Sequence, residues 1–407
     1  GTGSMAAPLD GIRVIEVSNW LAAPAATALM ADMGADVIKV EPPSGDVYRG
    51  FVLRSLGYNH DFPTNVAFQL DNRGKRSIVV DLEKPGGPEL VKKLAAGCDI
   101  FLTNLIQRRR VRYGLTFEDI RAVNPTAVYA SFSGYGTHGP DEARAGFDLG
   151  AFWAKSGIMG VLGEPDEPPP LCRGGQGDHT TSLNILAAVL AALRMRDKTG
   201  EGQHCEITLQ ATGAWTIAGD YAAALLAKHQ PPRISRKNPV TPMWNTYRTA
   251  DDRWIMFVNP VPYPTAWPAF CRLVGREVWD VDRYRDVMAL RADAPALVAE
   301  CDGIFAGQDF ATWLPKLEAS GLIWAPVATM ADMVADPQMR EMGWFKEIDS
   351  PLYGTFETLD TPFKIYGTDT GVRGPAPELG EHTFDVLAEL GVEGDELDRL
   401  ATSGTIG

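Results

Sequence analysis

Residues 11–40, GIRVIEVSNWLAAPAATALMADMGADVIKV, decide the fold class of this chain. Gly11–Val17 alternates as a strand does, Ala22–Met33 is an alanine-rich helix that Gly34 can end, and Asp36–Val40 is a second strand. Parallel strands need a crossover connection, and a helix is the usual one. The stretch therefore predicts one strand–helix–strand unit of a parallel sheet.

The same alternation continues for most of the next 190 residues. Further strands are expected at Ser77–Leu82, Asp99–Thr103, Thr126–Ser133 and His204–Leu209. Further helices are expected at Gly87–Ala96, Thr116–Val123 and Thr181–Arg196, with an alanine-rich helix that ends at Lys228. Alternating strands and helices predict an α/β fold with a parallel sheet and helices on both of its faces.

A proline-rich segment, Gln230–Pro242, marks a change of character. It reads as a linker. Beyond it, short amphipathic helices around the strand Trp254–Val258 indicate a smaller α+β domain. We therefore expect a large α/β domain in residues 5–228, a linker and small domain in 229–330, and a linker helix with a return to the large domain in 331–407.

Composition excludes several classes of function. The formal net charge of −14 argues against general nucleic-acid binding, although a local basic cluster can still hold a polyanion. No apolar run is long enough to span a membrane, and no signal-peptide pattern follows Met5, so a cytoplasmic protein without membrane attachment is expected. The five cysteines and six histidines are scattered, which predicts neither a metal site nor a disulfide framework.

Two basic clusters flank predicted strands. Arg73-Gly74-Lys75-Arg76 precedes one strand, and Arg108–Arg110 with Arg112 follows another. Ligands of parallel α/β sheets bind beyond the carboxyl ends of the strands, where the second cluster lies. Guanidinium groups donate paired hydrogen bonds to phosphates, but a solvated charged loop has the same composition. Both interpretations remain open.

Asp178 is the candidate catalytic residue. It lies in Gly175-Gln176-Gly177-Asp178-His179-Thr180-Thr181, where a glycine-rich loop meets a long helix. An aspartate here can be an ordinary N-cap. It can also be a reactive carboxylate whose pKa the helix start lowers, beside free N–H groups of residues 177–180 that would stabilise an oxyanion.

Many blocks in sequence order resemble the class III CoA-transferases, also called the CaiB/BaiF family. The blocks are Pro8–Glu16, Met33–Glu41, Asn72–Ile78, Tyr113-Gly114-Leu115, Ala130–Gly136, Gly177-Asp178 and Lys198–Gln203, with shorter matches at Tyr247 and Asp336-Pro337-Gln338. The resemblance implies an interlocked homodimer of subunits, each with a large α/β domain and a small domain. It also implies an enzyme that moves coenzyme A from an acyl-CoA thioester to a free carboxylic acid.

The resemblance assigns roles residue by residue. Asp178 matches the nucleophile, which becomes an aspartyl-CoA thioester during transfer. The positions that match the family's CoA contacts are Arg73, Lys75, Asn104, Leu105 and Arg112, although Leu105 stands where relatives usually have an aromatic residue. The positions that match the acyl pocket are Trp20, Leu21 and Phe147. No metal is implied.

Two other functions are weighed against transfer. The α-methylacyl-CoA racemases share the fold and use a histidine in a Gly-His-Asp block, but this chain has Gly146-Phe147-Asp148, and phenylalanine exchanges no proton. Their additional glutamate is matched by Asn259. An inactive acyl-CoA-binding homologue would be expected to lack the nucleophile, and Asp178 is present.

The acyl substrate is not fixed by these motifs. Formyl-CoA transferases carry a run of glycines at the positions matching 238–247, where this chain has none, so a small oxalate-like acid is less expected. Trp20, Trp153 and Trp244 either line a bulkier apolar pocket or belong to the core.

Overall fold

The structure, a computed structural model, describes residues 5–52 and 61–407. These residues fall into two compact units. The first runs to Ile158 and adds Cys172–Tyr221 and Gln338–Gly407, whereas the second consists of Met159–Leu171 and Ala222–Pro337. None of the described helices is long and apolar enough to cross a membrane.

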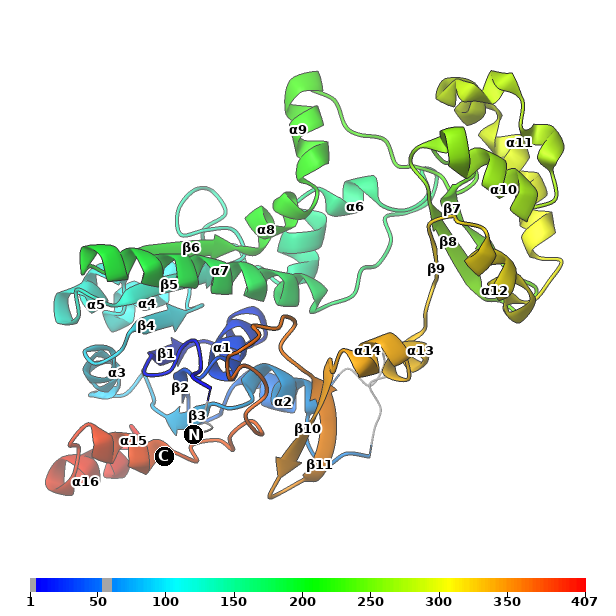
Figure 1. Ribbon diagram of the computed structural model, residues 1–407. Coiled ribbons are helices and arrows are strands. Elements are labelled where there is room, and N and C mark those ends of the chain that lie inside the picture. The colour runs from blue at the N-terminus through cyan, green and yellow to red at the C-terminus, as the bar shows by residue number, and fades with distance from the viewer. Residues whose placement is uncertain (1–4, 53–60) are drawn as a thin grey trace. The chain divides into compact units, whose positions relative to one another are not determined.

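The first unit is built on six parallel strands (Figure 1). Its elements as far as the end of the fifth strand are β1 (Arg13–Val17), α1 (Ala22–Asp32), β2 (Asp36–Glu41), η1 (Val47–Gly50), α2 (Val66–Asn72), β3 (Arg76–Val79), α3 (Gly87–Ala95), β4 (Ile100–Thr103), α4 (Gln107–Tyr113), α5 (Phe117–Val123) and β5 (Val128–Ser133). The others are η3 (Leu149–Ala154), α7 (Gln176–Thr199), β6 (His204–Thr208), α8 (Leu209–Thr216), β10 (Phe345–Ser350), β11 (Gly354–Leu359), α15 (Thr383–Glu389) and α16 (Gly394–Thr402). The division between the units crosses α6 (Ile158–Val161), α9 (Ala218–Ala227) and α14 (Pro337–Glu341).

The strand order is β3-β2-β1-β4-β5-β6, and each neighbouring pair is parallel. Ile15 of β1 pairs with Ile38 of β2 on one side and with Phe101 of β4 on the other. The chain therefore builds the sheet outward from β1 in one direction and then, from β4, in the opposite direction. The boundary between β1 and β4 is the switch point at which doubly wound sheets bind their ligands.

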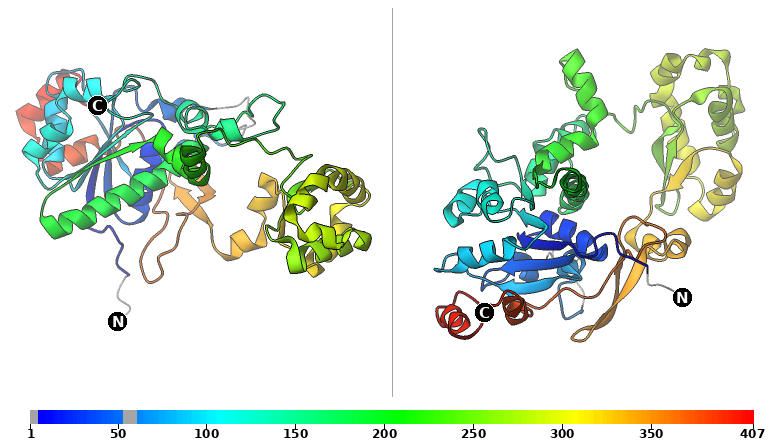
Figure 2. Two further views of the ribbon diagram at one scale, coloured as in Figure 1. Left: turned by 90° about the horizontal axis from the view of Figure 1, so that it is seen from above. Right: turned by 60° about the vertical axis from the view of Figure 1, so that its left-hand side comes forward.

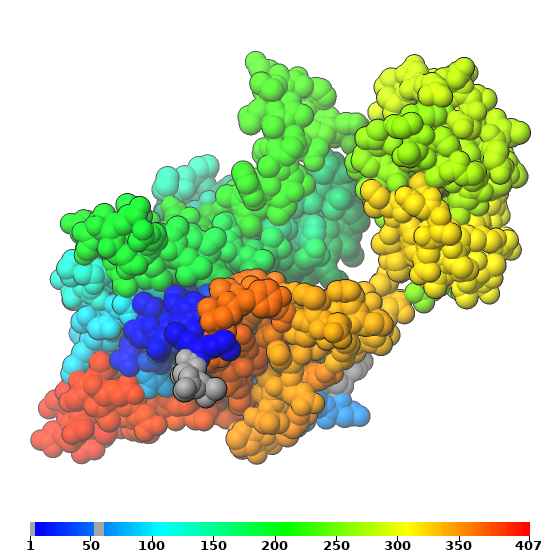
Figure 3. Space-filling view, in the orientation of Figure 1, coloured from blue at the N-terminus to red at the C-terminus, as the bar shows by residue number. Residues whose placement is uncertain are grey.

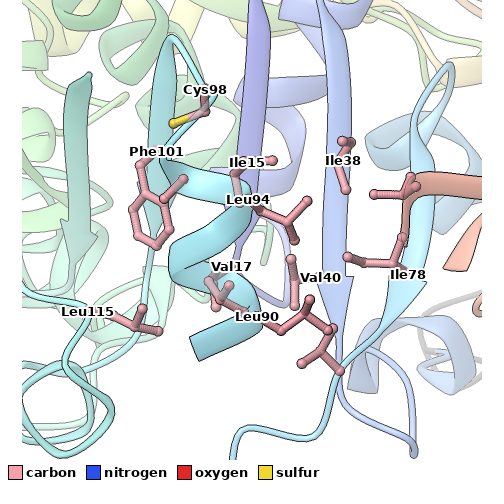
Figure 4. Close-up of a cluster of buried hydrophobic side chains, with 14 of the residues drawn as sticks. Ile15, Val17, Ile38, Val40, Ile78, Leu90, Leu94, Cys98, Phe101 and Leu115 are labelled. Carbon is pink, nitrogen blue, oxygen red and sulfur yellow. The ribbon is translucent and has the colours of Figure 1, made fainter. Parts of the chain in front are cut away.

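Helices cover both faces of this sheet (Figure 2). On one face, α3, α5 and α15 bury a cluster of apolar side chains against the strands. Figure 4 shows Leu94 of α3 beside Ile15 and Leu90 beside Val40. On the opposite face, α1 and α7 pack against each other and against the strands, α1 on β1 and β2 and α7 on β5 and β6.

The second unit has its own sheet and core. Its elements are β7 (Trp244–Arg248), β8 (Trp254–Val258), η4 (Pro262–Ala266), α10 (Trp267–Leu273), η5 (Glu277–Trp279), η6 (Asp282–Arg285), α11 (Val287–Phe305), α12 (Phe310–Ala319), β9 (Trp324–Pro326) and α13 (Met330–Val334). The antiparallel order is β7-β8-β9. Stacked aromatic rings such as those of Tyr247 and Phe305 fill the core between this sheet and α10–α12.

The predicted fold class is confirmed: a parallel sheet carries helices on both faces, and a smaller unit combines helices with an antiparallel sheet. Several helix bounds were wrong. The helix expected at Thr181–Arg196 is α7, which begins at Gln176. The alanine-rich helix that follows it is two helices, α8 and α9, because Ile217 leaves the helical conformation.

Candidate active site

Three segments of the first unit meet at one edge of the parallel sheet. Residues 19–21 follow β1, and residues 104–105 follow β4, its neighbour across the switch point. The chain leaves the carboxyl end of β5, passes through α7 and enters β6 at its amino end. The start of α7 must therefore lie at the carboxyl edge too. This edge is where a parallel α/β sheet binds its ligand.

Asn104 ties the first two segments together. Its side-chain Oδ1 accepts a hydrogen bond from the Asn19 backbone N–H at 3.2 Å, and its Nδ2 donates to the Asn19 carbonyl at 2.8 Å. The next residue, Leu105, is held through its own carbonyl, which accepts a hydrogen bond from Nε of the buried Arg110 at 2.8 Å. The predicted CoA-contact residues Asn104 and Leu105 are therefore placed together beside the switch point.

Trp20 adopts a left-handed backbone conformation with φ of 64°. A bulky residue rarely does so, and the conformation costs about 1–2 kcal/mol unless its surroundings enforce it. Here the Trp20 N–H donates to Oδ1 of the buried Asp46 at 3.1 Å. Held in this way, the indole packs edge-on against Phe51 and Phe147, each with its ring centroid 5.2 Å away.

The predicted pocket residues lie against the turn that precedes Asp178. Phe147 is 59% exposed and meets Trp20 from the segment before η3. Leu21 approaches Gly175, where an added Cβ would lie 3.2 Å from the leucine Cδ1. Gly175 also has φ of 87°, so both its space and its backbone conformation favour glycine. Trp20, Leu21 and Phe147 are thus assembled on one side of the start of α7.

Asp178 is the third residue of α7, and the N-cap is Gly175, which has no side chain to form a cap. The interpretation of Asp178 as an N-cap was therefore wrong. The helix starts earlier because Gly177 can pass close to Phe152: an added Cβ would stand 2.6 Å from the Phe152 Cγ. The half-buried carboxyl of Asp178 is consequently left without a capping role.

Asp148 caps this helix from a distant part of the chain. Its buried carboxylate accepts a hydrogen bond at Oδ2 from the Gly175 N–H at 2.7 Å and another from the Gly177 N–H at 3.1 Å. The His179 N–H donates to the Gly175 carbonyl within the helix. The expectation of free N–H groups from residue 177 to residue 180 was therefore wrong for Gly177 and His179.

The charges around Asp178 oppose its ionisation. Burial and the neighbouring Asp148 raise the pKa of Asp178 to about 8, against a smaller lowering effect of His179. The sequence-based expectation of a lowered pKa was wrong, because Asp148 accepts N–H groups at the helix start and adds a negative charge there. Nε2 of His179 donates to Oδ1 of the buried Asp71 at 2.8 Å. Burial alone would lower the pKa of His179, but the negative charge of Asp71 and this hydrogen bond raise it.

Arg73 and Lys75, two predicted CoA contacts, have buried side chains with partners inside the protein. Arg73 forms a two-pronged pair with Asp32, with distances of 3.1 and 2.7 Å. The Lys75 ammonium group lies 2.9 Å from each of three acceptors: Glu16 Oε2, the Pro24 carbonyl and Asn72 Oδ1. Because an ammonium group has three donors, Lys75 has none left for a phosphate in this arrangement.

The second basic cluster lies at the surface. Arg108, Arg109 and Arg112 of α4 are exposed, and Arg112 pairs with the exposed Glu83. Arg109 and Arg112 both lie over the ring of Tyr113, with the guanidinium carbons 5.5 Å from its centroid. Because α4 directly follows Asn104 and Leu105, the predicted contact Arg112 belongs to the helix that leaves the switch point.

The structure thus gathers most, not all, of the predicted site. Trp20 contacts Phe147, and Leu21 approaches the turn that leads to Asp178. Asn104 anchors the loop that carries Trp20, and Arg112 lies on the helix that follows Leu105. Arg73 and Lys75 are buried. Sequence reasoning missed Asp148, Asp71 and His179. The sequence did contain a signal for Asp148, because it directly follows Phe147 in the block that was compared with the racemases.

The other tryptophans differ in environment. Trp153 is buried against Phe152 in η3, as a core residue is. Trp244 is partly exposed and helps line a cavity of about 330 Å³ within the second unit. Among residues 5–52 and 61–407, no group of three or more histidine, cysteine or carboxylate side chains is placed to hold a metal ion.

Comparison with known proteins adds a family and relatives. The model of CoA-transferase family III matches residues 9–383. The chain is similar to (R)-2-hydroxy-4-methylpentanoate CoA-transferase of Clostridioides difficile, with 28% identity covering 98% of this chain and 99% of that one. It is also similar to succinate–glutarate CoA-transferase of Agrobacterium fabrum, with 31% identity covering 97% and 98%.

A solved structure agrees with these matches. A CAIB/BAIF family protein from Brucella suis superposes with a TM-score of 0.82 and 31% identity, covering 95% of this chain and all of that one.

Proposed function

The chain belongs to CoA-transferase family III and is a CoA-transferase, and from this premise we propose that it transfers CoA to a free carboxylic acid through a covalent aspartyl-CoA thioester on Asp178. The observation that carries the proposal is the position of this carboxyl. It is half-buried, makes no helix cap and lies at the carboxyl edge of the sheet, directly after the glycine turn that Leu21 approaches.

The first half of the reaction charges the enzyme. A carboxylate oxygen of Asp178 attacks the thioester carbonyl of the donor, and the carbon–sulfur bond breaks as CoA leaves as a thiolate. The product is a mixed anhydride of Asp178 and the donor acid. The thiolate then attacks the carbonyl carbon of Asp178, the donor carboxylate leaves with the bonding electron pair, and an aspartyl-CoA thioester remains.

The second half reverses these steps with another acid. The acceptor carboxylate attacks the Asp178 carbonyl and expels CoA thiolate, giving a second mixed anhydride. The thiolate attacks the acceptor's acyl carbon and releases Asp178 as a carboxylate. No oxidant, reductant or net proton is required. Because the thioester's energy is conserved in covalent bonds to the enzyme, the overall exchange is close to balanced.

CoA is assigned to the switch point and α4. The loop that Asn104 and Leu105 form after β4 holds residues 19–21 in place, and these include the predicted acyl-pocket residues Trp20 and Leu21. The loop would therefore contact the thiol end of CoA, which carries the acyl group. Arg112, with the exposed Arg108 and Arg109, supplies the positive charge that phosphates need in a chain with a net charge of −14. The predicted contacts of Arg73 and Lys75 remain predictions on which this assignment does not depend.

The acyl group is assigned to the aromatic side chains next to Asp178. Trp20 packs against the exposed Phe147, and Leu21 approaches Gly175 in the turn that leads to Asp178, so these residues present apolar surface on the approach to the carboxyl that is to react. The two relatives named above act on acids of different kinds, a branched hydroxy acid and dicarboxylic acids. We therefore propose a route of transfer and the residues that face the acyl group, but no particular acid.

We also propose a homodimer, as the resemblance implies. Helix α9 contains no buried residue in the chain taken alone. Its Leu226 is 87% exposed, and Leu225 of the same helix and Trp215 of α8 are exposed as well. The surface of this part of the chain is drawn in green in Figure 3. Apolar surface of this kind is typical of a buried interface between subunits. Sedimentation near micromolar concentration should give a dimer, and a stable monomer of about 44 kDa would contradict it.

A panel experiment tests the proposed route. The protein is incubated with pairs of one acyl-CoA and one free acid, and new thioesters are scored by mass spectrometry. Asp178→Asn is the matched variant, because the amide has the shape of the carboxyl but is a poor nucleophile. We expect new acyl-CoA with wild type and a loss of at least about 1000-fold in the variant, equivalent to roughly 4 kcal/mol. A variant within tenfold of wild type would refute the role of Asp178.

A further inference from the structure

The start of α7 depends on a carboxylate that neither the family blocks nor the predicted site assigned a role. Asp148 lies in the segment before η3 and is only 5% exposed. Its Oδ2 accepts the N–H groups of Gly175 and Gly177, which flank Gln176 in the turn that leads to Asp178. A buried carboxylate that accepts two backbone N–H groups fixes the backbone more firmly than a neutral acceptor would.

The turn held by Asp148 has no capping side chain of its own. Gly175 and Gly177 have no side chains, and the N-cap position makes no side-chain hydrogen bond. Leu21 and Phe152 limit the turn from outside by contact. The carbonyls of Gly175, Gln176 and Gly177 accept hydrogen bonds from His179, Thr180 and Thr181 of the same helix. The hydrogen bonds from Gly175 and Gly177 to Asp148 instead join the turn to another segment, so they orient the first turn of α7 relative to the rest of the site.

We propose that Asp148 is a positioning residue of the transfer reaction: its carboxylate holds the Gly175–Gly177 turn so that the Asp178 carboxyl faces the thioester. This inference rests on the proposed role of Asp178 as nucleophile. It adds a second function for the same carboxylate, because negative charge on Asp148 opposes ionisation of the nucleophile and keeps its basicity high. Burial raises the pKa of Asp148 itself, whereas the hydrogen bonds from Gly175 and Gly177 favour its ionised form.

Two other charged groups face Asp178, and comparison with them distinguishes the positioning role of Asp148 from its effect as a charge. His179 on α7 favours the ionised form of Asp178, whereas Asp71 on α2 opposes it more weakly than Asp148 does. Asp148 and Asp71 thus act in the same sense electrostatically, but the hydrogen bonds to Gly175 and Gly177 come from Asp148. Asp148→Asn removes the charge and retains an oxygen acceptor, and Asp148→Ala removes both.

The pH profile of transfer distinguishes the two variants. In wild type, kcat/KM should rise with pH through the pKa of Asp178, which is about 8. Asp148→Asn should move this acid limb down by about one pH unit or more and keep kcat at high pH within about fivefold. Asp148→Ala should lower kcat at least about 100-fold at every pH, with a change in acyl-CoA KM of less than about threefold.

Asp119→Asn is the matched control. Asp119 also accepts a backbone N–H at a helix start, that of Thr116 at 3.0 Å, but it belongs to the capping box of α5. Its profile should equal that of wild type. An acid limb unchanged in Asp148→Asn, or a kcat in Asp148→Ala that matches Asp148→Asn, would overturn the proposal.

A double-mutant cycle of thermal unfolding gives a readout that needs no activity. Asp178→Asn, Asp148→Asn and the double variant are compared with wild type at pH 7.5. Asp178→Asn should raise Tm clearly in the presence of Asp148 and by a smaller amount in the Asp148→Asn background, where burial still raises the pKa of Asp178. Equal gains would contradict the charge coupling. Failure of the proposed function would be seen differently, as absence of new acyl-CoA in wild type while the cycle still shows coupling.

Discussion

Glu16 and Asp178 are both removed from water in the same unit, yet their surroundings have opposite effects on their charge. Burial alone would raise the pKa of Glu16, but the ammonium groups of Lys39 and Lys75, each 2.9 Å away, lower it to about 2. Burial raises the pKa of Asp178 too, and Asp148 raises it further, to about 8. Burial acts alike on both groups, so the charge of the neighbours decides the outcome.

The difference separates a structural carboxylate from a reactive one. Glu16 also accepts hydrogen bonds from Ser18 and Thr27, so both of its oxygens are fully used. The same network continues through Lys39 to Asp46, whose other oxygen holds the N–H of Trp20. The paired cluster thus stabilises the loop that lines the candidate site, while the unpaired Asp178 keeps an oxygen that is more basic and therefore more nucleophilic.

The largest effect is expected from uncharging the paired carboxylate. Glu16→Gln leaves two buried ammonium groups with one anionic partner fewer, and breaking a buried ion pair in this way costs about 3 kcal/mol. Urea unfolding at pH 7 should show this loss as a lower midpoint with an unchanged slope. An unfolding midpoint equal to that of wild type would mean that the cluster does not stabilise the fold.

The corresponding substitution at Asp178, Asp178→Asn, should raise the stability of the fold instead of lowering it. Because the folded-state pKa of Asp178 is raised, its ionisation works against folding, and Asp178→Asn removes that cost. We expect a gain of about 2 kcal/mol in the free energy of unfolding at pH 7. Chemical unfolding of the two variants side by side measures both signs, and a loss in Asp178→Asn would remove the contrast.

Lowering the pH should change the stabilities of Asp178→Asn and Glu16→Gln, relative to wild type, in different ways. A raised pKa gives stability that is present below the unfolded-state value and is lost as pH rises through about 8, so the gain of Asp178→Asn should be nearly gone at pH 4. A lowered pKa gives stability that is present above 4.5 and is lost as pH falls through about 2, so most of the deficit of Glu16→Gln should persist at pH 4. Unfolding curves at pH 7 and pH 4 test both windows.

A smaller effect is expected at the surface. Arg112→Ala should raise the KM for acyl-CoA about threefold to tenfold at low salt, with little change in kcat, and the difference should shrink as salt screens the contact. Arg121→Ala is the control, because this exposed arginine lies near the end of α5, which leads to the amino end of β5. Equal KM values for the two variants would rule out Arg112 as a phosphate contact.

The sequence predicted the sheet because its signals are local. Residues 11–40 contain a complete strand–helix–strand pattern, and β1, α1 and β2 lie within about two residues of the expected bounds. The start of α7 was misplaced because Gly175 and Gly177 look like loop residues, whereas their need for glycine comes from contacts with Leu21 and Phe152. A long-range contact of this kind leaves no periodic pattern.

Motifs in the sequence supplied the candidate site residues, but they could not show which partners the charged ones have in the fold. Asp178 stands in a family block, and Trp20 and Phe147, which match positions of the acyl pocket, pack against each other in the structure. Arg73 and Lys75 stand in such a block too, but Asp32 and Glu16, their partners, lie far away in sequence. The charge of a side chain can be read from the sequence, whereas the group that neutralises it depends on the tertiary fold.

The most direct test of the account is to identify the residue that becomes attached to CoA. Wild type is incubated with an acyl-CoA in the absence of an acceptor acid, digested, and examined by peptide mass spectrometry, with hydroxylamine added in parallel to convert an enzyme thioester to a hydroxamate. We expect a CoA adduct, or the hydroxamate formed from it, on Asp178 alone in wild type, and no adduct in Asp178→Asn. Transfer activity with no adduct on Asp178, or with an adduct on another residue, would contradict it.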